Sequence, residues 1–314
     1  MKLAIAGAGM IVRELLSFED QINNLDIVGI YARNKNKASD LNINLIYDNY
    51  ETMLKENQAD TIYIALPNIL HFEFAKKAIL AGKHVIMEKP FTINVSQAAE
   101  LYKLSKENQV IIIDAVNIRF LPSYYKLKEA INQIGEIKII NCNFSQYSSR
   151  YDRFKNGDIT PVFDHSLAGG ALLDINIYNI DFVVGLFGIP ETVLYSPNIE
   201  NKVDTSGILL MDYGSFKAVC IGAKDCKGLN SAIIQGEKGY ITVDSINSIN
   251  SFTVVTDQVI THRSNREHRL LPEFRVFVDI IDNRDFKTSD QLMRLTLKTI
   301  TVMEEASSPL IYLN

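Results

Sequence analysis

The alternation of short apolar strands with helical segments constrains the first third of this 314-residue chain more than any other feature. The predicted strands lie at about residues 3–6, 27–32, 61–66, 84–87 and 110–114. Strands that alternate with helices in this way form parallel sheets, because the chain must cross over the sheet between consecutive strands. We therefore predict a doubly wound parallel sheet. Ligands of such sheets bind beyond the carboxyl ends of the strands.

From about residue 119 the pattern changes to extended, β-branched runs that are joined by turn residues. These runs lie at residues 137–147, 192–196, 206–213, 216–223, 231–235, 240–244 and 252–262. Their spacing predicts a mostly antiparallel sheet. Helical spacing returns near residues 122–134, 169–185 and 289–306. We therefore predict an α/β protein of two domains, a Rossmann-type parallel-sheet domain over 1–118 and a second α/β domain with a large open sheet over 119–314.

The composition argues against several classes of protein. The net charge of −5 and the lack of a long basic tract argue against nucleic acid as a partner. The cysteines are scattered and the histidines lack metal-ligand spacing, so neither disulfides nor a metal site is expected. No apolar run approaches the ~18 residues of a membrane span, and the apolar N-terminus is too short and glycine-broken for a signal peptide. We expect a cytoplasmic protein with no membrane partner.

A glycine-containing turn follows the first predicted strand. Gly7 and Gly9 stand between that strand and a helical pattern, which is the context that the dinucleotide-binding fingerprint requires. Gly7 permits a tight turn, and Gly9 lets the backbone approach a pyrophosphate at the helix N-terminus, next to Met10 and Ile11. Val12 is bulkier than the glycine or alanine usual at the third position, and a purely structural turn remains an alternative.

The end of the second predicted strand bears on the choice of cofactor. NAD-preferring sites usually place an acid there to hold the ribose 2′-hydroxyl. No acid occurs between Asp26 and Asp40, whereas Arg33, Lys35 and Lys37 do. A 2′-phosphate suits such a loop, with Arg33 as the best-placed partner. NADP(H) is therefore favoured, with NAD(H) as the alternative cofactor and a solvated basic loop as the alternative structure.

The fourth predicted strand ends abruptly in Glu88, Lys89 and Pro90. The residue before a proline is extended, and an X-Pro bond adopts the cis form at little cost. Taken alone, these charges fit a solvated turn equally well. Their position at the same sheet edge as Gly7 and Arg33 makes Lys89 a candidate catalytic residue and Glu88 a neighbour of the cofactor. Further predicted cofactor contacts at this edge are Ala65, Leu66, Pro67, Asn68 and His71.

For two of these residues a structural role is the alternative to a cofactor contact. Asn68 is predicted to cap the following helix, and His71 is either a packing histidine in its first turn or a polar group beside the cofactor. Asn94 is predicted to cap the helix after the Glu-Lys-Pro segment.

Farther along, Asp174 and Tyr178 lie four residues apart and share one side of the helix over 169–185. A satisfied buried polar pair is the alternative there.

These motifs together resemble those of the glucose–fructose oxidoreductase/inositol dehydrogenase (Gfo/Idh/MocA) family, over nearly the whole chain. The resemblance implies a Rossmann domain followed by an α/β domain whose open sheet mediates homodimers or homotetramers. It implies oxidation of a secondary alcohol of a sugar, polyol or cyclic diol with NAD or NADP. The segments that carry it are Gly7–Gly9, Ala65–Asn68 with His71, Ala81–Val85, Glu88–Pro90, Arg119–Phe120 with Pro122, Gly169–Asp174 and Gln235–Gly239.

The resemblance also implies roles for individual residues. Lys89 is expected near the nicotinamide and the substrate, often with a cis bond into Pro90. Tyr178 occupies the position of the histidine in the usual Asp-x-x-x-His motif, as in the dihydrodiol dehydrogenase-like branch. We hypothesise that Tyr178 carries the hydroxyl proton and that the Lys89 ammonium favours its phenolate. Asp174 then orients Lys89 or binds a substrate hydroxyl. Asn176 stands where glycine is usual.

The predicted substrate pocket draws on Arg119, Tyr147, Arg150 and His165. A second hypothesis is a non-catalytic NADP-binding regulator or sensor of the same fold, and a third is a non-redox carbohydrate-binding protein. The presence of Lys89, Asp174 and Tyr178 favours an enzyme, because a sensor needs no base.

Overall fold

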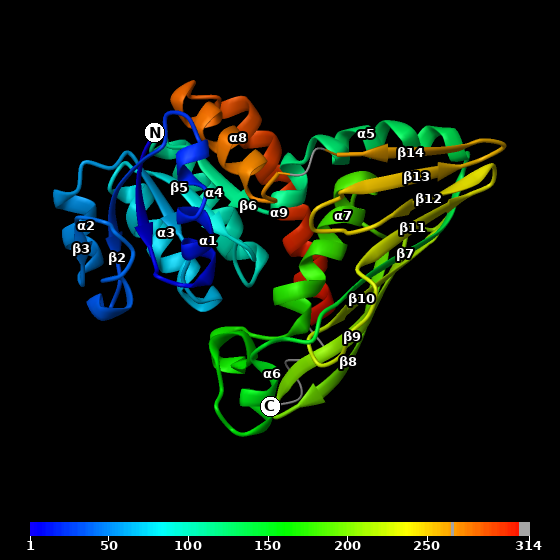
Figure 1. Cartoon of the computed structure of the whole chain (residues 1–314), viewed down its shortest axis with the longest axis horizontal. Coiled ribbons are helices and arrows are strands. Elements are labelled where there is room, and N and C mark those ends of the chain that lie inside the picture. Colours follow the sequence, from blue (N-terminus) through cyan, green and yellow to red (C-terminus); the bar gives the residue numbers. More distant parts are fainter. Residues whose placement is uncertain (265–266, 308–314) are drawn as a thin grey trace. The chain divides into compact units, whose positions relative to one another are not determined.

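The computed structural model describes residues 1–264 and 267–307. The chain forms two compact units (Figure 1). Unit 1 contains Met1–Ala115 and Leu270–Leu297, and unit 2 contains Val116–Arg269 and the chain from Lys298 onward. The predicted division at 118/119 is close to the first crossing between the units. The prediction assigned all residues after 118 to the second domain. In the structure, Leu270–Leu297 belongs to unit 1. Residues 308–314 of that predicted domain lie outside the described residues.

Unit 1 is built on a six-stranded sheet of order β3-β2-β1-β4-β5-β6 in which all neighbours are parallel. This arrangement confirms the predicted doubly wound sheet. β3 is a two-residue strand that is not among the predicted strands. The strands are β1 (Lys2–Ala6), β2 (Asp26–Tyr31), β3 (Ile46–Tyr47), β4 (Thr61–Ile64), β5 (His84–Glu88) and β6 (Ile112–Ala115).

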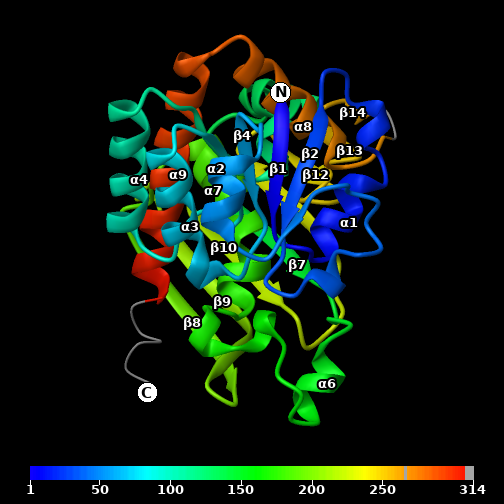
Figure 2. The same cartoon turned by 90° about the vertical axis from the view of Figure 1, so that its left-hand side faces the viewer.

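Helices cover both faces of this sheet. Figure 2 shows α2, α3 and α4 on one side of the strands and α1 on the other. The predicted cap Asn94 accepts a hydrogen bond from Gln97 N (2.9 Å), whereas the predicted cap Asn68 is wrong, because it begins a 3₁₀ turn after Pro67. The helices are α1 (Met10–Leu16), α2 (Tyr50–Glu56), α3 (His71–Leu80) and α4 (Val95–Glu107).

The returning segment of unit 1 contains α8 (Leu271–Asp282) and the first part of α9 (Phe286–Ser307). Sequence reasoning did not identify α8. Its Phe274 is fully buried and packs edge-to-face against Phe18 and Tyr63, with ring centroids 6.3 and 5.4 Å apart. Aromatic pairs at these separations are favourable beyond the area they bury. α8 therefore covers the same side of the sheet as the segment after α1.

Unit 2 contains an eight-stranded sheet of order β14-β13-β12-β11-β7-β10-β9-β8. β7 and β10 are parallel and all other neighbours are antiparallel, which confirms the mostly antiparallel prediction. The predicted run 252–262 is two strands that form a hairpin. The strands are β7 (Ile137–Ser145), β8 (Thr192–Glu200), β9 (Val203–Asp212), β10 (Lys217–Ala223), β11 (Ser231–Gly236), β12 (Gly239–Val243), β13 (Ser251–Val255) and β14 (Val259–Arg263).

A helix that begins with a π-helical turn packs on one face of this sheet, against β7 and β10. The π turn spans Leu172–Asn176 and continues directly into α7 (Ile177–Phe187). Within the described residues, His165–Phe187 is the one helical stretch long and apolar enough to cross a membrane, and 61% of its most apolar window is buried inside the structure. The core helix of a soluble protein has the same character. Unit 2 also contains α5 (Pro122–Ala130), α6 (Tyr151–Lys155) and the last part of α9.

Candidate functional site

The carboxyl ends of β1, β2, β4 and β5 lie at one edge of the parallel sheet. Gly7 N donates to the Tyr31 carbonyl (2.9 Å), and Ala65 N donates to the Ala6 carbonyl (2.8 Å). Glu88, at the end of β5, pairs with Ala115 of β6. The structure therefore brings the glycine turn, the basic loop and the Glu-Lys-Pro segment to the same edge of unit 1, as the sequence predicted.

The two glycines of the turn differ in whether the fold leaves room for a side chain. Gly7 has φ +120°, and a Cβ there would lie 2.2 Å from the Ala65 carbonyl oxygen. Only glycine fits this position. Gly9 precedes α1, and a Cβ there would meet no atom within 4 Å. The space in front of Gly9 is thus open where a pyrophosphate would approach the first-turn N–H groups of the helix. Beside it, Met10 is exposed and Ile11 is half-buried.

The basic loop after β2 is held in place by α1. Arg13 forms two hydrogen bonds with the Asp40 carboxylate (2.7 and 3.0 Å) and a third with the Lys37 carbonyl (3.2 Å). The Arg13 guanidinium lowers the pKa of Asp40. The nearest acid after β2 is therefore already engaged, while Arg33 and Lys37 are exposed. The loop suits a 2′-phosphate better than a free ribose hydroxyl.

The exit of β5 is tightly organised. The Tyr63 hydroxyl donates to Glu88 Oε1 (2.5 Å), and Lys89 N donates to Glu88 Oε2 (3.3 Å). Burial, reinforced by the Glu88 carboxylate, raises the pKa of Tyr63 well above its usual value, so the phenol remains a donor. The Lys89–Pro90 peptide bond is cis, and Lys89 is half-buried. This geometry assigns Glu88 to shaping the turn that carries Lys89.

His71 is fully buried, and both of its ring nitrogens face carbonyl oxygens. Nδ1 lies 2.9 Å from the Pro90 oxygen, and Nε2 lies 2.8 Å from the Leu66 oxygen. Burial lowers the pKa of His71, and the Lys89 ammonium adds to this effect, although the carbonyl contacts oppose it. A ring with both nitrogens engaged has none left for a ligand. These contacts give His71 a packing role, in which it links two loops, and its cofactor contact stays a prediction. The other predicted contacts in the Leu66 loop are half-buried, namely Ala65, Leu66, Pro67 and Asn68.

The second group of candidate residues lies in unit 2. Asp174 is within the π turn, and Tyr178 follows in α7, where its ring packs on Phe144 with centroids 5.6 Å apart. The sequence did not suggest the partner of Asp174. Lys224, immediately after β10, places Nζ 2.8 Å from Asp174 Oδ2 and is only 3% exposed. The one signal that could have found it is a lysine at the exit of an apolar strand, as at Lys89.

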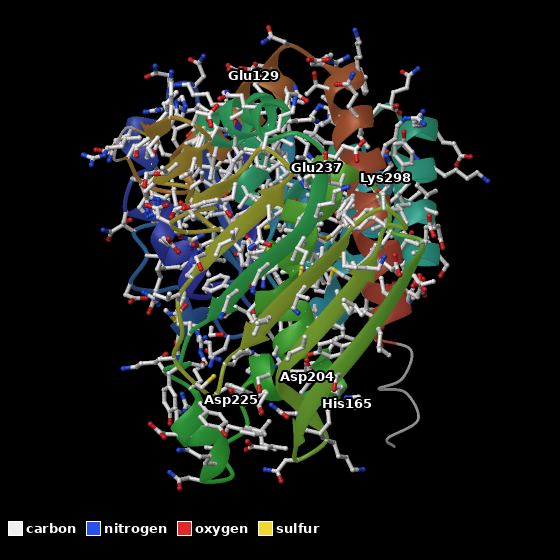
Figure 3. The ribbon with its side chains drawn as sticks, turned by 90° about the vertical axis from the view of Figure 1, so that its right-hand side faces the viewer. Glu129, His165, Asp204, Asp225, Glu237 and Lys298 are labelled. Atoms are coloured by element: carbon white, nitrogen blue, oxygen red, sulfur yellow. The ribbon has the colours of Figure 1, made fainter. Side chains whose placement is uncertain are left out.

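A second buried carboxyl lies near Lys224. Asp204 Oδ2 accepts hydrogen bonds from Leu172 N and from the Tyr195 hydroxyl, both at 2.7 Å. Burial raises the pKa of Asp204 to about 6, although these donors and the Lys224 ammonium each lower it. A Cβ on Gly170 would lie 1.9 Å from Asp204 Oδ1, which explains the glycine in the Gly169–Asp174 motif. Figure 3 shows Asp204 and Asp225 at the end of the sheet opposite Glu237.

Asn176, at the position where glycine is usual, is accommodated by the neighbouring strand. Its Nδ2 donates to the Cys220 carbonyl (3.2 Å), and its Oδ1 accepts from Asn179 (2.7 Å). A Cβ on Gly222 of β10 would lie 2.6 Å from the Asn176 Cβ. Because Gly222 has no side chain, β10 leaves room for Asn176 at the start of the helix that packs on it.

The predicted substrate residues are dispersed through unit 2. Arg119 is 2% exposed and pairs with Asp181 through Nε (3.0 and 3.1 Å) and Nη2, which favours a structural role over substrate contact. The Tyr147 hydroxyl donates to Asp152 (2.7 Å) and accepts from Lys155 (3.1 Å), so it belongs to the aromatic cluster around α6. Of the remaining two, His165 is exposed and Arg150 is half-buried.

A cavity of about 820 Å³ lies elsewhere in unit 1, between the end of α4 and the start of α9. Its lining includes Gln109 and Val110, which precede β6, so it opens at the amino edge of the sheet, away from Gly7 and Lys89. In residues 1–264 and 267–307, no group of three His, Cys, Asp or Glu side chains is arranged to hold a metal ion.

Comparisons with known proteins agree with this architecture. Residues 1–115 match the oxidoreductase family with an NAD-binding Rossmann fold, and residues 124–242 match the GFO/IDH/MocA C-terminal domain. The scyllo-inositol 2-dehydrogenase (NADP+) IolU of Bacillus subtilis (strain 168) is 30% identical over 320 residues, covering 98% of this chain and 96% of the relative. The trans-1,2-dihydrobenzene-1,2-diol dehydrogenase of Xenopus tropicalis is 29% identical over 256 residues, covering 78% of this chain and 75% of the relative.

The fold also matches solved structures. A 3-ketoreductase from Actinomadura kijaniata, in complex with NADP and TDP-benzene, superposes with a TM-score of 0.85 at 19% identity. That match covers 98% of this chain and 97% of the ketoreductase. At this identity the likeness shows the fold alone. The matches to both family domains and the full-length relative decide the assignment: the chain belongs to the Gfo/Idh/MocA family of oxidoreductases.

Proposed function

We propose that this protein is an NADP(H)-dependent dehydrogenase that acts on a secondary alcohol, or on the corresponding ketone, of a sugar, polyol or cyclic diol. The observation that carries the proposal is the position of Lys89. Its side chain leaves the end of β5 at the same sheet edge as the Gly7 turn and the Arg33 loop. A cation at that edge suits a substrate oxygen next to a dinucleotide, because ligands of such sheets bind there.

The cofactor is assigned to unit 1. The turn from Gly7 to Gly9, with Met10 and Ile11, is proposed to hold the pyrophosphate, and the loop containing Arg33 and Lys37 the 2′-phosphate. The open space at Gly9 and the engagement of Asp40 by Arg13 support both assignments. NAD(H) is the alternative cofactor, and it would have to bind without an acid at the end of β2.

A bound nicotinamide would supply the hydride acceptor for oxidation of the carbinol carbon, or the hydride donor for reduction of the ketone. Tyr178 is proposed to accept the hydroxyl proton during oxidation and to return it during reduction. A free phenol has a pKa of about 10 and needs a nearby cation to act as a base at neutral pH. Lys89 is proposed to bind a substrate oxygen and stabilise the charge that develops there. Asp174 is proposed to bind a neighbouring hydroxyl.

A non-catalytic NADP-binding sensor of the same fold is the competing function. Steady-state reduction of NADP+, measured at 340 nm with a panel of polyols, separates the two. The panel begins with scyllo-inositol and a trans-dihydrodiol, which the names of the two sequence relatives suggest. Turnover with any member supports the enzyme. Tight NADPH binding without turnover on any member, in either direction, supports the sensor.

We also propose a homodimer or homotetramer formed through the sheet of unit 2. On β9, Leu209 and Met211 are fully buried, while Ile208 and Leu210 are 50% and 38% exposed. Leu194 of β8, 64% exposed, pairs with Leu210. A contiguous exposed apolar surface of this kind is typical of a protein interface. Light scattering after size exclusion should give a dimer or tetramer for the wild type and a smaller species for Ile208→Glu, whereas a monomeric wild type would contradict the proposal.

A cytoplasmic location completes the proposal. Cys142 and Cys220 are buried free thiols and Cys226 is an exposed one, as expected in a reducing compartment. Cell fractionation of the tagged protein tests this location, and recovery in a membrane or secreted fraction would contradict it.

A further inference from the structure

Lys224 is a lysine that the structure buries almost completely. Its side chain is 3% exposed. Its backbone is fixed from both sides, since Lys224 N donates to the Thr205 carbonyl and its own carbonyl accepts from Ser148 N, each at 2.8 Å. The residue thus extends β10 between β9 and the segment after β7. Lysine is among the residues least often buried in this way unless it is paired.

The Lys224 ammonium has its partners within unit 2. Nζ lies 2.8 Å from Asp174 Oδ2, donates to the Val162 carbonyl, and stands 4.3 Å from the centroid of the Phe163 ring. The ring face and the carbonyl help to shield the cation from water. This ion pair is costly to break from the side of Asp174, because the Lys224 ammonium alone would be left as a poorly solvated charge.

Asp174 lies four residues before Tyr178, at the start of the same helix. It lies within the π turn that begins the helix, and its N–H donates to the Gly170 carbonyl (3.1 Å). π turns are rare and are frequent at functional sites. The carboxylate is still 30% exposed, so it can receive a ligand while Lys224 holds it. The nearby Asp204 does not take over this role, because its Oδ2 is occupied by Leu172 N and the Tyr195 hydroxyl.

We propose that Lys224 is a positioning residue of the active site: its buried ammonium holds the Asp174 carboxylate charged and in a single orientation on the π turn that leads to Tyr178. This inference rests on the proposed dehydrogenase function and adds to it a residue outside the predicted set. Lys224 acts through Asp174 and does not touch the substrate, because Phe163 and Val162 cover it.

A double-mutant cycle tests the inference. Lys224→Met removes the charge at similar length, Lys224→Arg keeps it, and Asp174→Asn removes the partner's charge. Lys217→Met is the matched control, because Lys217 begins β10 and its contacts, an ion pair with Asp212 and a hydrogen bond to the Gly214 carbonyl, are exposed. kcat and KM are measured for wild type and all variants with the best polyol substrate, and NADPH affinity is measured by fluorescence.

The inference predicts that Lys224→Met lowers kcat about 100-fold with unchanged NADPH affinity, since a small misplacement at a reacting site costs this much. Lys224→Arg recovers most of that loss, and Lys217→Met behaves as wild type. In the Asp174→Asn background, Lys224→Met causes no further loss, because coupled residues are non-additive. Additive losses, or unchanged kcat in Lys224→Met, would overturn the inference.

A crystal structure of Lys224→Met provides a readout that does not depend on turnover. The Asp174 carboxylate should leave the orientation seen here, and finding it unmoved would contradict the inference. If the wild type turns over no substrate, the proposed function fails, and this structure alone decides whether Lys224 fixes Asp174. A variant that does not fold is replaced by Lys224→Met combined with Asp174→Asn, which removes both charges of this ion pair.

Discussion

The Nδ1 atom of His71 lies 2.9 Å from the carbonyl oxygen of Pro90, directly after the cis bond that follows Lys89. The other ring nitrogen lies 2.8 Å from the Leu66 carbonyl. One buried imidazole therefore links the loop after β4 to the segment that presents Lys89. We expect the position of the proposed catalytic lysine to depend on this link.

This link predicts a specific dependence of stability on pH. Burial lowers the pKa of His71, whereas in the unfolded chain it titrates near pH 6.5. The unfolded state therefore binds the proton first, so stability is complete above about pH 6.5 and falls as the pH decreases below it, by up to ~1.4 kcal/mol per unit. Denaturant unfolding at pH 7.5 and 5.5 should show a larger loss for wild type than for His71→Gln. Equal losses would rule out this account of His71.

The two turn glycines should respond differently to alanine. Gly7→Ala places a Cβ against the Ala65 carbonyl at φ +120° and should destabilise the fold by more than ~1 kcal/mol. Gly9→Ala meets no atom within 4 Å, so it should leave the unfolding midpoint unchanged while weakening NADPH binding. Thermal unfolding and fluorescence titration of both variants check this contrast. A Gly9→Ala protein with wild-type NADPH affinity would contradict the proposed pyrophosphate position.

Arg33 should distinguish the two cofactors. A charge-assisted contact to a 2′-phosphate is worth about 1.5–3 kcal/mol, so Arg33→Ala should weaken NADPH binding roughly 10- to 100-fold and NADH binding little. Lys55→Ala, an exposed lysine of α2, is the control. Fluorescence titrations with both nucleotides measure the effect. Equal weakening of both would refute the 2′-phosphate assignment.

Arg119 should affect stability and leave turnover unchanged. It is 2% exposed and paired with Asp181, which also accepts from the Thr299 hydroxyl (2.7 Å). Removing one partner of a buried ion pair typically costs about 3–5 kcal/mol. Arg119→Met should lower the free energy of unfolding by this amount, with little change in KM for the folded fraction. A stable variant with a raised KM would restore the substrate role predicted from the sequence.

Much of the fold follows from local pattern. The parallel strands are predictable because each is a buried apolar run between helices, and β9 alternates because only one of its faces is covered. The sequence did not reveal α8 because this helix is stabilised by contacts with residues far away in the chain. Phe274 packs on Phe18 and Tyr63, which no local window of sequence contains. The same holds for the return of the chain to unit 1, which tertiary packing determines.

The candidate site was also predictable only in part. The common location of Gly7 and Lys89 could be predicted because the carboxyl ends of parallel strands meet at one edge of a sheet, independently of side-chain packing. Arg119 and His71 were assigned to ligands because the sequence shows their polarity and conceals their burial. Lys224 was missed because its ion pair with Asp174 joins residues that lie 50 positions apart in the chain (224 − 174). Burial and long-range pairing are therefore what the sequence alone did not reveal.

The role of Tyr178 is the central claim. Tyr178→Phe keeps the ring that packs on Phe144 and removes only the hydroxyl. The decisive measurement is kcat of this variant beside its NADPH affinity, with the best polyol substrate of the wild type. Loss of general acid–base catalysis predicts a fall in kcat of about 10²- to 10⁴-fold with unchanged NADPH affinity. Wild-type turnover in Tyr178→Phe would contradict the account.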